Sequence, residues 1–149
     1  MNPRQLSVLL VEDSGVLADR LRETVMSVSG VQLIGTVDCE ADAVEALQRL
    51  PIDVLVLDLH LRQGTGFGVL RSLRQNRMAT VVSIVLSNYD LAEYRRAAAA
   101  LGAEYFLYKL REFERLPTIL QQLGADWATG IGSASSDGTG DAAFQLRQP

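Results

Sequence analysis

The sequence predicts an α/β protein built on a doubly wound, parallel, five-stranded sheet. Five short apolar runs recur along the 149 residues, and segments with helical periodicity follow them. Most runs are continuously apolar rather than alternating, which is typical of strands covered on both faces. Strands that alternate with helices form a parallel sheet with right-handed crossovers. The predicted strands are residues 7–11, 31–37, 53–58, 81–87 and 104–109.

Each predicted strand is followed by a segment whose apolar residues repeat with the period of an α-helix. In the first three segments, polar side chains occupy the opposite face, as expected for helices that pack on a sheet. The predicted buried faces of these helices are Leu17, Leu21, Val25 and Val28; Val44 and Leu47; and, within residues 66–76, Phe67, Leu70 and Leu73.

The last two helices are predicted from composition and capping. Residues 91–101 are alanine-rich, which favours a helix. Asp90 and Glu93 have the spacing of a capping box at its start. Residues 113–123 form the fifth helix, with Pro117 in its first turn, because a proline in a helix interior would break the helix.

The chain is predicted to divide into one domain, residues 5–127, and a tail, residues 128–149. Gly124 is expected to end the last helix, and Trp127 to anchor that end. The segment that follows is rich in glycine, serine and threonine and cannot bury a core. We therefore predict a flexible tail after the domain.

The overall composition argues against several classes of function. The net charge is −4 and the isoelectric point is near 4.9, so nucleic-acid binding by bulk electrostatics is not expected. No apolar stretch approaches the ~20 residues of a membrane helix, and the N-terminus has no apolar signal-peptide core. A single cysteine, Cys39, suits a protein without internal disulfides in a reducing cytoplasm.

Chemically reactive side chains stand where the predicted strands end. They are Glu12 and Asp13 after the first strand, Asp58 at the end of the third, Ser87 at the end of the fourth and Lys109 at the end of the fifth. Because the carboxyl ends of parallel strands meet at one edge of the sheet, we expect these side chains to converge. Three neighbouring carboxylates repel one another, and Mg²⁺ is the natural compensating ion, since it takes carboxylate, water and phosphate oxygens. The hydroxyl and the ammonium complete a set that can hold a phosphoryl group.

Lys109 is the single lysine of a chain that otherwise uses thirteen arginines. A compact ammonium on a flexible stem can pair with a carboxylate and then with a phosphoryl oxygen, which suits a planar guanidinium less well. The choice of lysine at this position therefore indicates a functional charge. The alternative is a solvated surface charge.

The other side chains of the set also have structural interpretations. Glu12 and Asp13 could merely cap the first helix, since acidic residues favour helix N-termini. Asp58 could be a turn residue, although an apolar strand that ends in aspartate argues against this. Ser87 is uninformative by itself, because serine commonly ends strands. His60, the chain's one histidine, is expected in a loop near the site rather than on a helix face, where phosphotransfer histidines sit.

Four motifs and one glycine stand in a characteristic order: VLLVEDS at 8–14, LVLDL at 55–59, Gly66 eight residues after Asp58, VLSN at 85–88 and GAEYFLYK at 102–109. Over roughly residues 5–124, the chain resembles the receiver domain of bacterial two-component response regulators. The resemblance implies a flavodoxin-like fold with strand order 2-1-3-4-5. It also implies a stand-alone receiver similar to the chemotaxis regulators.

The same resemblance implies a role for each site residue. Asp58 is the phosphoacceptor, and Lys109 binds a phosphoryl oxygen. Ser87 takes the position of the switch hydroxyl and Phe106 that of the switch aromatic, although Phe106 fits equally well as a core residue. The implied Mg²⁺ ligands are the side chains of Glu12, Asp13 and Asp58 and the backbone carbonyl of His60.

Three residues depart from the family pattern. Leu110 replaces the usual proline after Lys109, so the bond between them is expected to be trans, since a non-proline cis bond costs about 3 kcal/mol or more. Arg62 replaces a proline, so we expect a more mobile loop at residues 61–65. Asn88 replaces a smaller residue and is expected to narrow access to the phosphoryl site. None of these changes removes a reactive group.

These inferences together predict a single-domain response regulator. Asp58 is expected to accept a phosphoryl group from a sensor histidine kinase or a phosphotransfer protein, with Mg²⁺ as cofactor. The surface of the fourth helix, fifth strand and fifth helix is expected to change and to contact a downstream protein. The chain would be no enzyme beyond its own phosphorylation and dephosphorylation. The roles of diffusible effector and phosphorelay intermediate both stay open.

Two other classes of function compete with this prediction. One is a phosphorylation-independent scaffold that keeps the receiver fold, which Asn88 and Leu110 favour. The other is a small phosphatase with an aspartyl nucleophile. A phosphatase would need a second acid two residues after Asp58, where the chain has His60.

Overall fold

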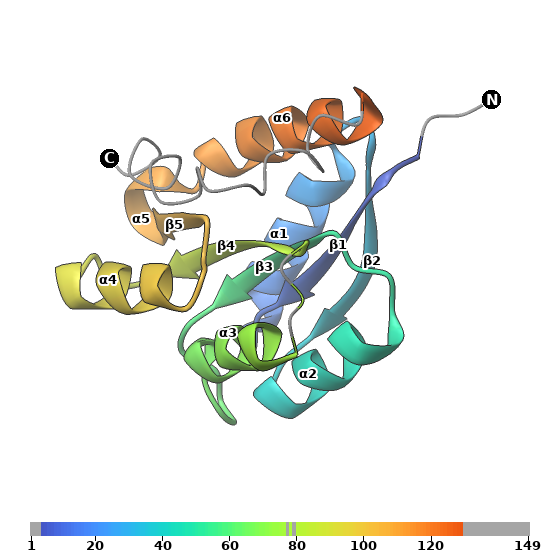
Figure 1. Ribbon diagram of the computed structural model, residues 1–149. Helices are drawn as coiled ribbons and strands as arrows, with labels where there is room; N and C mark the ends of the chain where they lie inside the picture. The colour runs from blue at the N-terminus through green and yellow to red at the C-terminus, as the bar shows by residue number, and fades with distance from the viewer. Residues whose placement is uncertain (1–3, 77, 79, 130–149) are drawn as a thin grey trace.

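The computed structural model describes residues 4–76, 78 and 80–129. Its centre is a parallel five-stranded sheet in the order β2-β1-β3-β4-β5, so the predicted fold class and strand order are confirmed (Figure 1). Every neighbouring pair of strands runs parallel. The strands are β1 (Leu6–Val11), β2 (Val31–Val37), β3 (Val54–Asp58), β4 (Val82–Ser87) and β5 (Tyr105–Tyr108).

Helices cover both faces of this sheet (Figure 1). Two of them, α1 (Gly15–Met26) and α6 (Arg115–Thr129), pack on one face. Three others, α2 (Glu40–Arg49), α3 (Gly66–Gln75) and α4 (Ala92–Ala100), pack on the opposite face. A short helix, α5 (Lys109–Glu112), follows β5 directly.

The two faces of the sheet belong to two hydrophobic cores. Successive side chains of a strand point to opposite faces. In β1, Val8 and Leu10 lie in the core under α1 and α6, whereas Leu9 and Val11 lie in the core under α2, α3 and α4. Each strand therefore needs apolar residues on both of its faces, that is, at odd and at even positions. This explains the continuous apolar runs. Burying a leucine of this kind contributes roughly 1.5–3 kcal/mol.

The last helix is longer than the sequence predicted. Gly124 was expected to end it, but α6 continues through this residue to Thr129, so that prediction is wrong. The helix continues because Trp127 packs against the core under α1 and α6, and the Arg4 guanidinium lies 4.8 Å from the centre of its ring. The predicted tail thus overlaps the end of α6, and its remainder, residues 130–149, lies outside the described residues.

The predicted capping box of α4 is also wrong. The N-cap position is Leu91, whose side chain makes no capping hydrogen bond. The Asp90 carboxylate instead accepts a hydrogen bond from Arg95 Nε at 2.8 Å. An ion pair one turn into the helix has therefore taken the carboxylate that the local spacing assigned to the helix N-terminus.

The end of β5 differs from the prediction by one residue. Lys109 is the first residue of α5 rather than the last of the strand. The described residues contain no cis peptide bond, so the predicted trans bond between Lys109 and Leu110 is confirmed. Among the helices of the described part of the chain, none has the length and apolar character needed to cross a membrane.

Candidate functional site

The carboxyl ends of β1 and β3 and the start of α5 bring three carboxylates and one ammonium together. Lys109 Nζ lies 2.9 Å from Glu12 Oε1 and 3.3 Å from Asp58 Oδ2. One carboxylate oxygen from each of Glu12, Asp13 and Asp58 lies within 4.8 Å of the others. Four of the five side chains that were expected to converge are therefore neighbours, and the lysine lies between two of the carboxylates.

Three side chains of this cluster are buried and Asp13 is half-buried, which decides between the functional and the structural interpretations of these residues. Lys109 is 9% exposed, and Glu12 and Asp58 are each 3% exposed, so Lys109 is not a solvated surface charge. The acidic pair does not cap α1 either. The N-cap is Ser14, whose hydroxyl accepts a hydrogen bond from Leu17 N at 3.4 Å. Glu12 Oε2 accepts one from Ser14 N at 3.1 Å, which orients the carboxylate toward the cluster.

Asp58 is held by the backbone around it. Its Oδ1 accepts a hydrogen bond from His60 N at 3.2 Å. Gly66 packs directly on the same segment, since a Cβ placed on it would lie 2.5 Å from the Asp58 carbonyl oxygen. No side chain fits in that space, which is why the position eight residues after Asp58 requires glycine.

Burial raises the pKa of both carboxyl groups above their ordinary values. Desolvation is the largest cause for Glu12 and for Asp58, and Lys109 lowers both pKa values without cancelling it. Asp58 also raises the pKa of Glu12. One ammonium therefore does not fully compensate the negative charge of the two buried carboxylates. A second cation would favour the ionised forms of both carboxyl groups. Oxygen donors of this kind suit a hard divalent ion.

These pKa shifts predict that Asp58 destabilises the fold at neutral pH. A raised pKa means that the folded protein holds its proton more tightly than the unfolded chain. The free energy of unfolding therefore falls as the pH rises above 3.8, the ordinary value, until the raised value is passed. We expect Asp58→Asn to be more stable than the wild type at pH 7 and the difference to vanish toward pH 4. Urea melts of both proteins across this pH range, without Mg²⁺, measure the difference in the free energy of unfolding. A difference that stayed constant with pH would contradict the prediction.

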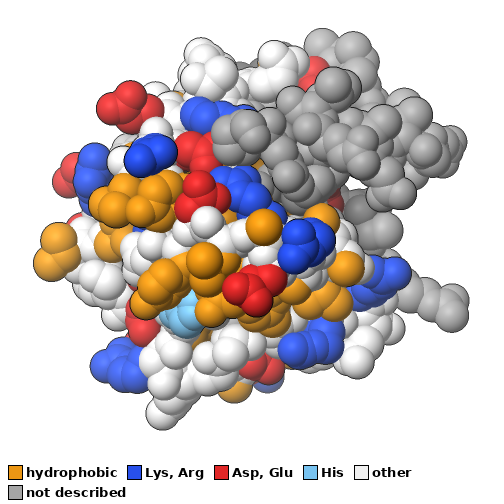
Figure 2. Space-filling view, turned by 90° about the vertical axis from the view of Figure 1, so that its left-hand side faces the viewer, with side chains coloured by type: hydrophobic (Ala, Val, Ile, Leu, Met, Phe, Trp, Pro, Cys, Tyr) orange, Lys and Arg blue, Asp and Glu red, His pale blue; other side chains and the backbone are white. Residues whose placement is uncertain are grey.

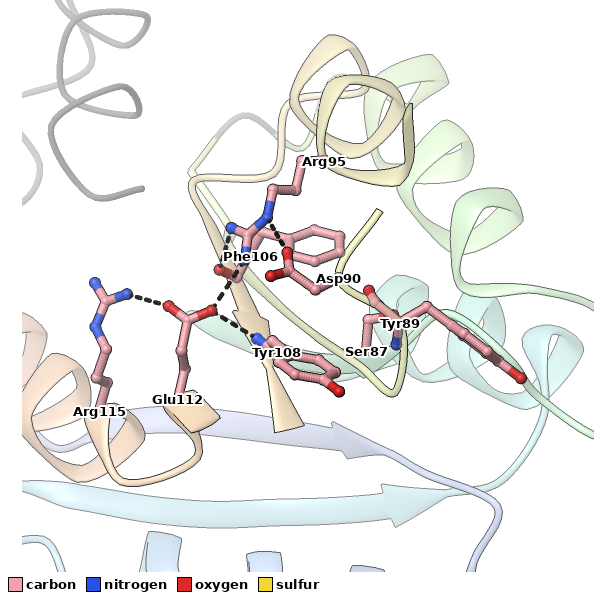
Figure 3. A network of polar contacts seen from close by, with 8 residues as sticks. All are labelled: Ser87, Tyr89, Asp90, Arg95, Phe106, Tyr108, Glu112 and Arg115. Carbon is pink, nitrogen blue, oxygen red and sulfur yellow. Dashed lines mark hydrogen bonds and ion pairs between the residues drawn. The ribbon is translucent and has the colours of Figure 1, made fainter. Parts of the chain in front are cut away.

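Ser87 ends β4 and Phe106 lies in the neighbouring β5, each with contacts of its own (Figure 3). Ser87 is fully buried, and its hydroxyl donates to the Tyr89 carbonyl and accepts from the Tyr89 N–H, both at 3.0 Å. Phe106 is only 2% exposed. Its ring is thus already inside the protein, and the roles of both residues as switches stay predictions.

A network that the sequence did not predict covers Phe106 (Figure 3). The Arg95 guanidinium lies 4.7 Å from the centre of the Phe106 ring and donates to the Phe106 carbonyl at 3.3 Å. Arg95 also pairs with Asp90 at 2.8 Å and with Glu112 at 3.0 Å. Glu112 in turn accepts from Tyr108 N at 3.0 Å. The network joins the β4–α4 loop, α4, β5 and α5, and residues from 90 to 112 contribute, so no local spacing reveals it.

His60 lies in the β3–α3 loop and is exposed, as the sequence predicted. Its ring contacts that of Tyr89, with centroids 4.9 Å apart, and lies 5.6 Å from that of Tyr94. Figure 2 shows the imidazole next to hydrophobic side chains on this face of the molecule. Asn88, which was expected to narrow access to the site, is exposed.

The family model of the response regulator receiver domain matches residues 8–121. The chain belongs to this family. Receiver domains accept phosphoryl groups, typically bind Mg²⁺ in an acidic pocket, and interact with histidine kinases or phosphotransfer proteins and with downstream effectors. The resemblance inferred from the motifs is thereby confirmed.

Curated relatives of this receiver domain are longer proteins. The chain is 33% identical over 132 residues to protein-glutamate methylesterase/protein-glutamine glutaminase 5 of Myxococcus xanthus, covering 87% of this chain and 38% of the relative. It is 25% identical to the probable C4-dicarboxylate response regulator DctR of Priestia megaterium, covering 82% of this chain and 53% of the relative. The chain thus spans from 38% to 53% of the length of these two relatives.

Solved structures share the fold of this receiver domain. The signal receiver domain of a putative Luxo repressor protein from Vibrio parahaemolyticus is 27% identical, with a TM-score of 0.75 over 88% of this chain and 98% of that one. The response regulator domain of Thermotoga maritima CheB is 22% identical, with a TM-score of 0.71 over 85% of this chain and 98% of that one. The second similarity concerns the fold alone.

Proposed function

We propose that this receiver domain accepts a phosphoryl group on Asp58 from a histidine kinase or a phosphotransfer protein. It then signals through a protein contact that depends on this phosphorylation. The observation that carries the proposal is the buried cluster in which Lys109 Nζ lies between Glu12 Oε1, at 2.9 Å, and Asp58 Oδ2, at 3.3 Å. A charge held this close to the reacting oxygen can pair with a transferring phosphoryl group.

In this mechanism an Asp58 carboxylate oxygen attacks the phosphorus atom of a phosphohistidine. The new O–P bond forms as the P–N bond breaks, and its electron pair leaves with the imidazole. The His60 N–H, 3.2 Å from Asp58 Oδ1, orients the carboxylate. Lys109 exchanges a carboxylate partner for a phosphoryl oxygen and stabilises the charge on it. Glu12, Asp13, Asp58 and the His60 carbonyl would hold Mg²⁺, which supplies further charge neutralisation when bound.

Incubation with acetyl phosphate and Mg²⁺, followed by intact-mass measurement, tests this proposal. The wild-type chain is expected to gain about 80 Da, the mass of one phosphoryl group. Asp58→Asn keeps the shape of the side chain and should gain nothing. Continuous hydrolysis of organic phosphates would support the phosphatase alternative. A wild-type chain without the adduct, even with its cognate kinase, would support the scaffold alternative.

Asp13→Ala is expected to abolish Mg²⁺ binding and phosphorylation while the chain still folds. The substitution removes one ligand of the proposed metal site and also relieves repulsion within the carboxylate cluster. The measurement is the shift of the urea midpoint caused by Mg²⁺, since an ion that binds the folded state raises its stability. Asp19→Ala, at an exposed residue of α1, is the matched control. A full Mg²⁺ response in Asp13→Ala would exclude Asp13 as a ligand.

The output surface is proposed to comprise α4, β5 and α6, the helix that the sequence predicted over residues 113–123. Phosphorylation would draw the Ser87 hydroxyl away from the Tyr89 backbone, which it contacts at 3.0 Å, and toward the phosphoryl group. The β4–α4 loop would follow, and through Asp90 and Arg95 the change would reach Phe106 and α5. A diffusible effector and a phosphorelay intermediate would use this surface alike.

A second candidate function is the phosphorylation-independent scaffold. Two departures from the family pattern favour it: Asn88 stands where a smaller residue is usual, and Leu110 stands where a proline is usual. The two candidates differ in the response to the phosphate mimic beryllofluoride, which should shift the NMR signals of α4, β5 and α6 only in a phosphorylation-dependent receiver.

A further inference from the structure

Glu40 ties the loop between β3 and α3 to the N-terminus of α2. Its Oε1 accepts a hydrogen bond from Thr65 N at 2.9 Å, and its own backbone N–H donates to the Gln63 carbonyl at 3.1 Å. Arg62 and Asp38 form a further ion pair at 3.2 Å between the same segments, but both are largely exposed and such pairs contribute little. Glu40 is therefore the principal contact between α2 and this loop, which the sequence predicted to be more mobile.

Two glycines make room for the Glu40 side chain. Gly64 has a φ of +76°, and a Cβ placed on it would lie 2.6 Å from Glu40 Oε1. A Cβ on Gly68, in the first turn of α3, would overlap the Glu40 carboxylate. Glycine destabilises a helix relative to alanine, so Gly68 is unfavourable for α3 by itself. The space that it leaves for a carboxylate explains its presence.

Thr65 connects Glu40 to the phosphoryl-transfer site. Its backbone pairs with that of His60 in an antiparallel bridge. Its hydroxyl accepts a hydrogen bond from Gly68 N at 3.1 Å and so caps α3. His60 N donates to Asp58 Oδ1 at 3.2 Å. A continuous set of contacts thus runs from the Glu40 carboxylate through Thr65 and His60 to Asp58.

We propose that Glu40 is a positioning residue for the metal and phosphoryl site. By holding Thr65, it fixes the loop that directs the His60 N–H to Asp58 and the His60 carbonyl to Mg²⁺. Glu40 itself contacts neither the metal ligands nor the reacting oxygen and acts through the backbone of the loop. The inference rests on the proposed function, because the His60 carbonyl is a metal ligand only within it.

The test measures Mg²⁺ affinity by calorimetry and the amide hydrogen exchange of Thr65 in the full chain. Glu40→Ala is expected to weaken Mg²⁺ binding roughly tenfold and to speed exchange at Thr65. Glu40→Gln keeps an oxygen that accepts from the Thr65 N–H and should stay near the wild type. Glu45→Ala is the control, because Glu45 is an exposed residue of α2 whose ion pair with Arg49 lies on the helix surface.

Gly68→Ala tests the same contact from the side of α3. Alanine favours the helix but displaces the Glu40 carboxylate, so we expect weaker Mg²⁺ binding and faster Thr65 exchange with helix content retained. In a Glu40→Ala background the carboxylate is already absent. The second substitution should then have no further effect on either measurement, a non-additivity that a general loss of stability would not produce.

Three results would overturn the proposal. Wild-type Mg²⁺ affinity in Glu40→Ala excludes a positioning role, whatever happens at Thr65. An equal loss of Mg²⁺ affinity in Glu40→Ala and Glu45→Ala would mean that the loop responds to any change in α2. If the wild-type chain binds no Mg²⁺, the proposed metal site is wrong. The amide exchange of Thr65 then decides by itself whether Glu40 holds the loop. Unchanged exchange in Glu40→Ala shows that it does not.

Discussion

Lys109→Ala is expected to lower the free energy of unfolding at pH 7 by about 3–5 kcal/mol, because it breaks a buried ion pair by removing one partner. The ammonium of Lys109 lies 2.9 Å from one buried carboxylate, that of Glu12, and 3.3 Å from another, that of Asp58. Without it both carboxylates stay buried and lose the ammonium that pairs with them. Urea melts of the wild type and the variant measure the loss.

The loss of stability in Lys109→Ala should increase as the pH rises. The pKa values of Glu12 and Asp58 are already raised by burial, and removing the ammonium raises both further. Folding then favours the protonated forms over a wider pH range, so the stability of the variant falls more steeply as the pH rises. The difference from the wild type is therefore largest at neutral pH and smallest in acid. Added Mg²⁺ should recover part of the loss at pH 7, since it binds the folded state.

Two matched variants separate this effect from general damage to α5. Arg111→Ala removes a cation from an exposed position of the same helix and should cost little. Lys109→Arg keeps the charge and should fold and bind Mg²⁺, yet its planar head should fail to couple the phosphoryl group to the output surface. Equal losses in Lys109→Ala and Arg111→Ala would mean that the buried cluster does not depend on the ammonium.

The main features of the fold and the site follow from patterns that are local in the sequence. Continuous apolar runs identify strands covered on both faces, and both cores of the structure contain residues from β1, β3, β4 and β5. Parallel strands bring their carboxyl ends to one edge of the sheet, so the sequence alone predicts that Glu12, Asp58 and Lys109 lie together. Because Lys109 is the one lysine in an arginine-rich chain, the sequence also predicted that it supplies the positive charge of this cluster.

The features that the sequence missed depend on side-chain contacts that no local spacing rule describes. Gly124 has the local character of a helix end, yet the packing of Trp127 one turn later extends the helix. Asp90 has the spacing of a capping residue, but Arg95 takes its carboxylate. The contact of Glu40 with Thr65 joins residues 25 positions apart, and no spacing rule connects them. Local propensity is a weak guide where a tertiary contact competes for the same group.

Glu112→Ala is expected to lower the free energy of unfolding by roughly 2–3 kcal/mol and to loosen β5 from α4. The carboxylate accepts from Tyr108 N at 3.0 Å, from Arg95 at 3.0 Å and from Arg115 at 2.7 Å. The Glu112 and Arg95 side chains are only 10% and 12% exposed, so the groups left behind are poorly solvated. Arg115 is more exposed, and its pair should contribute little.

The loss should be visible at the output surface as well as in overall stability. Arg95 keeps Asp90 as a partner in this variant but loses the anchor on α5 that holds its guanidinium over the Phe106 ring (Figure 3). The Tyr108 N–H loses its acceptor and should exchange with solvent faster than in the wild type. Glu114→Ala, at an exposed position two residues further along, is the control for a lost acidic side chain.

A double-mutant cycle of Arg95→Met and Glu112→Ala isolates the contact between these two residues. Methionine keeps apolar contact with the Phe106 ring but cannot pair with Glu112. If the pair joins α4 to α5, the two losses should be non-additive by about 1 kcal/mol or more, because the second substitution removes an interaction already broken. Additive losses, with Tyr108 exchange unchanged in Glu112→Ala, would mean that the network of Figure 3 does not couple the β4–α4 loop to α5. The signal from Ser87 would then have to reach the output surface by another route.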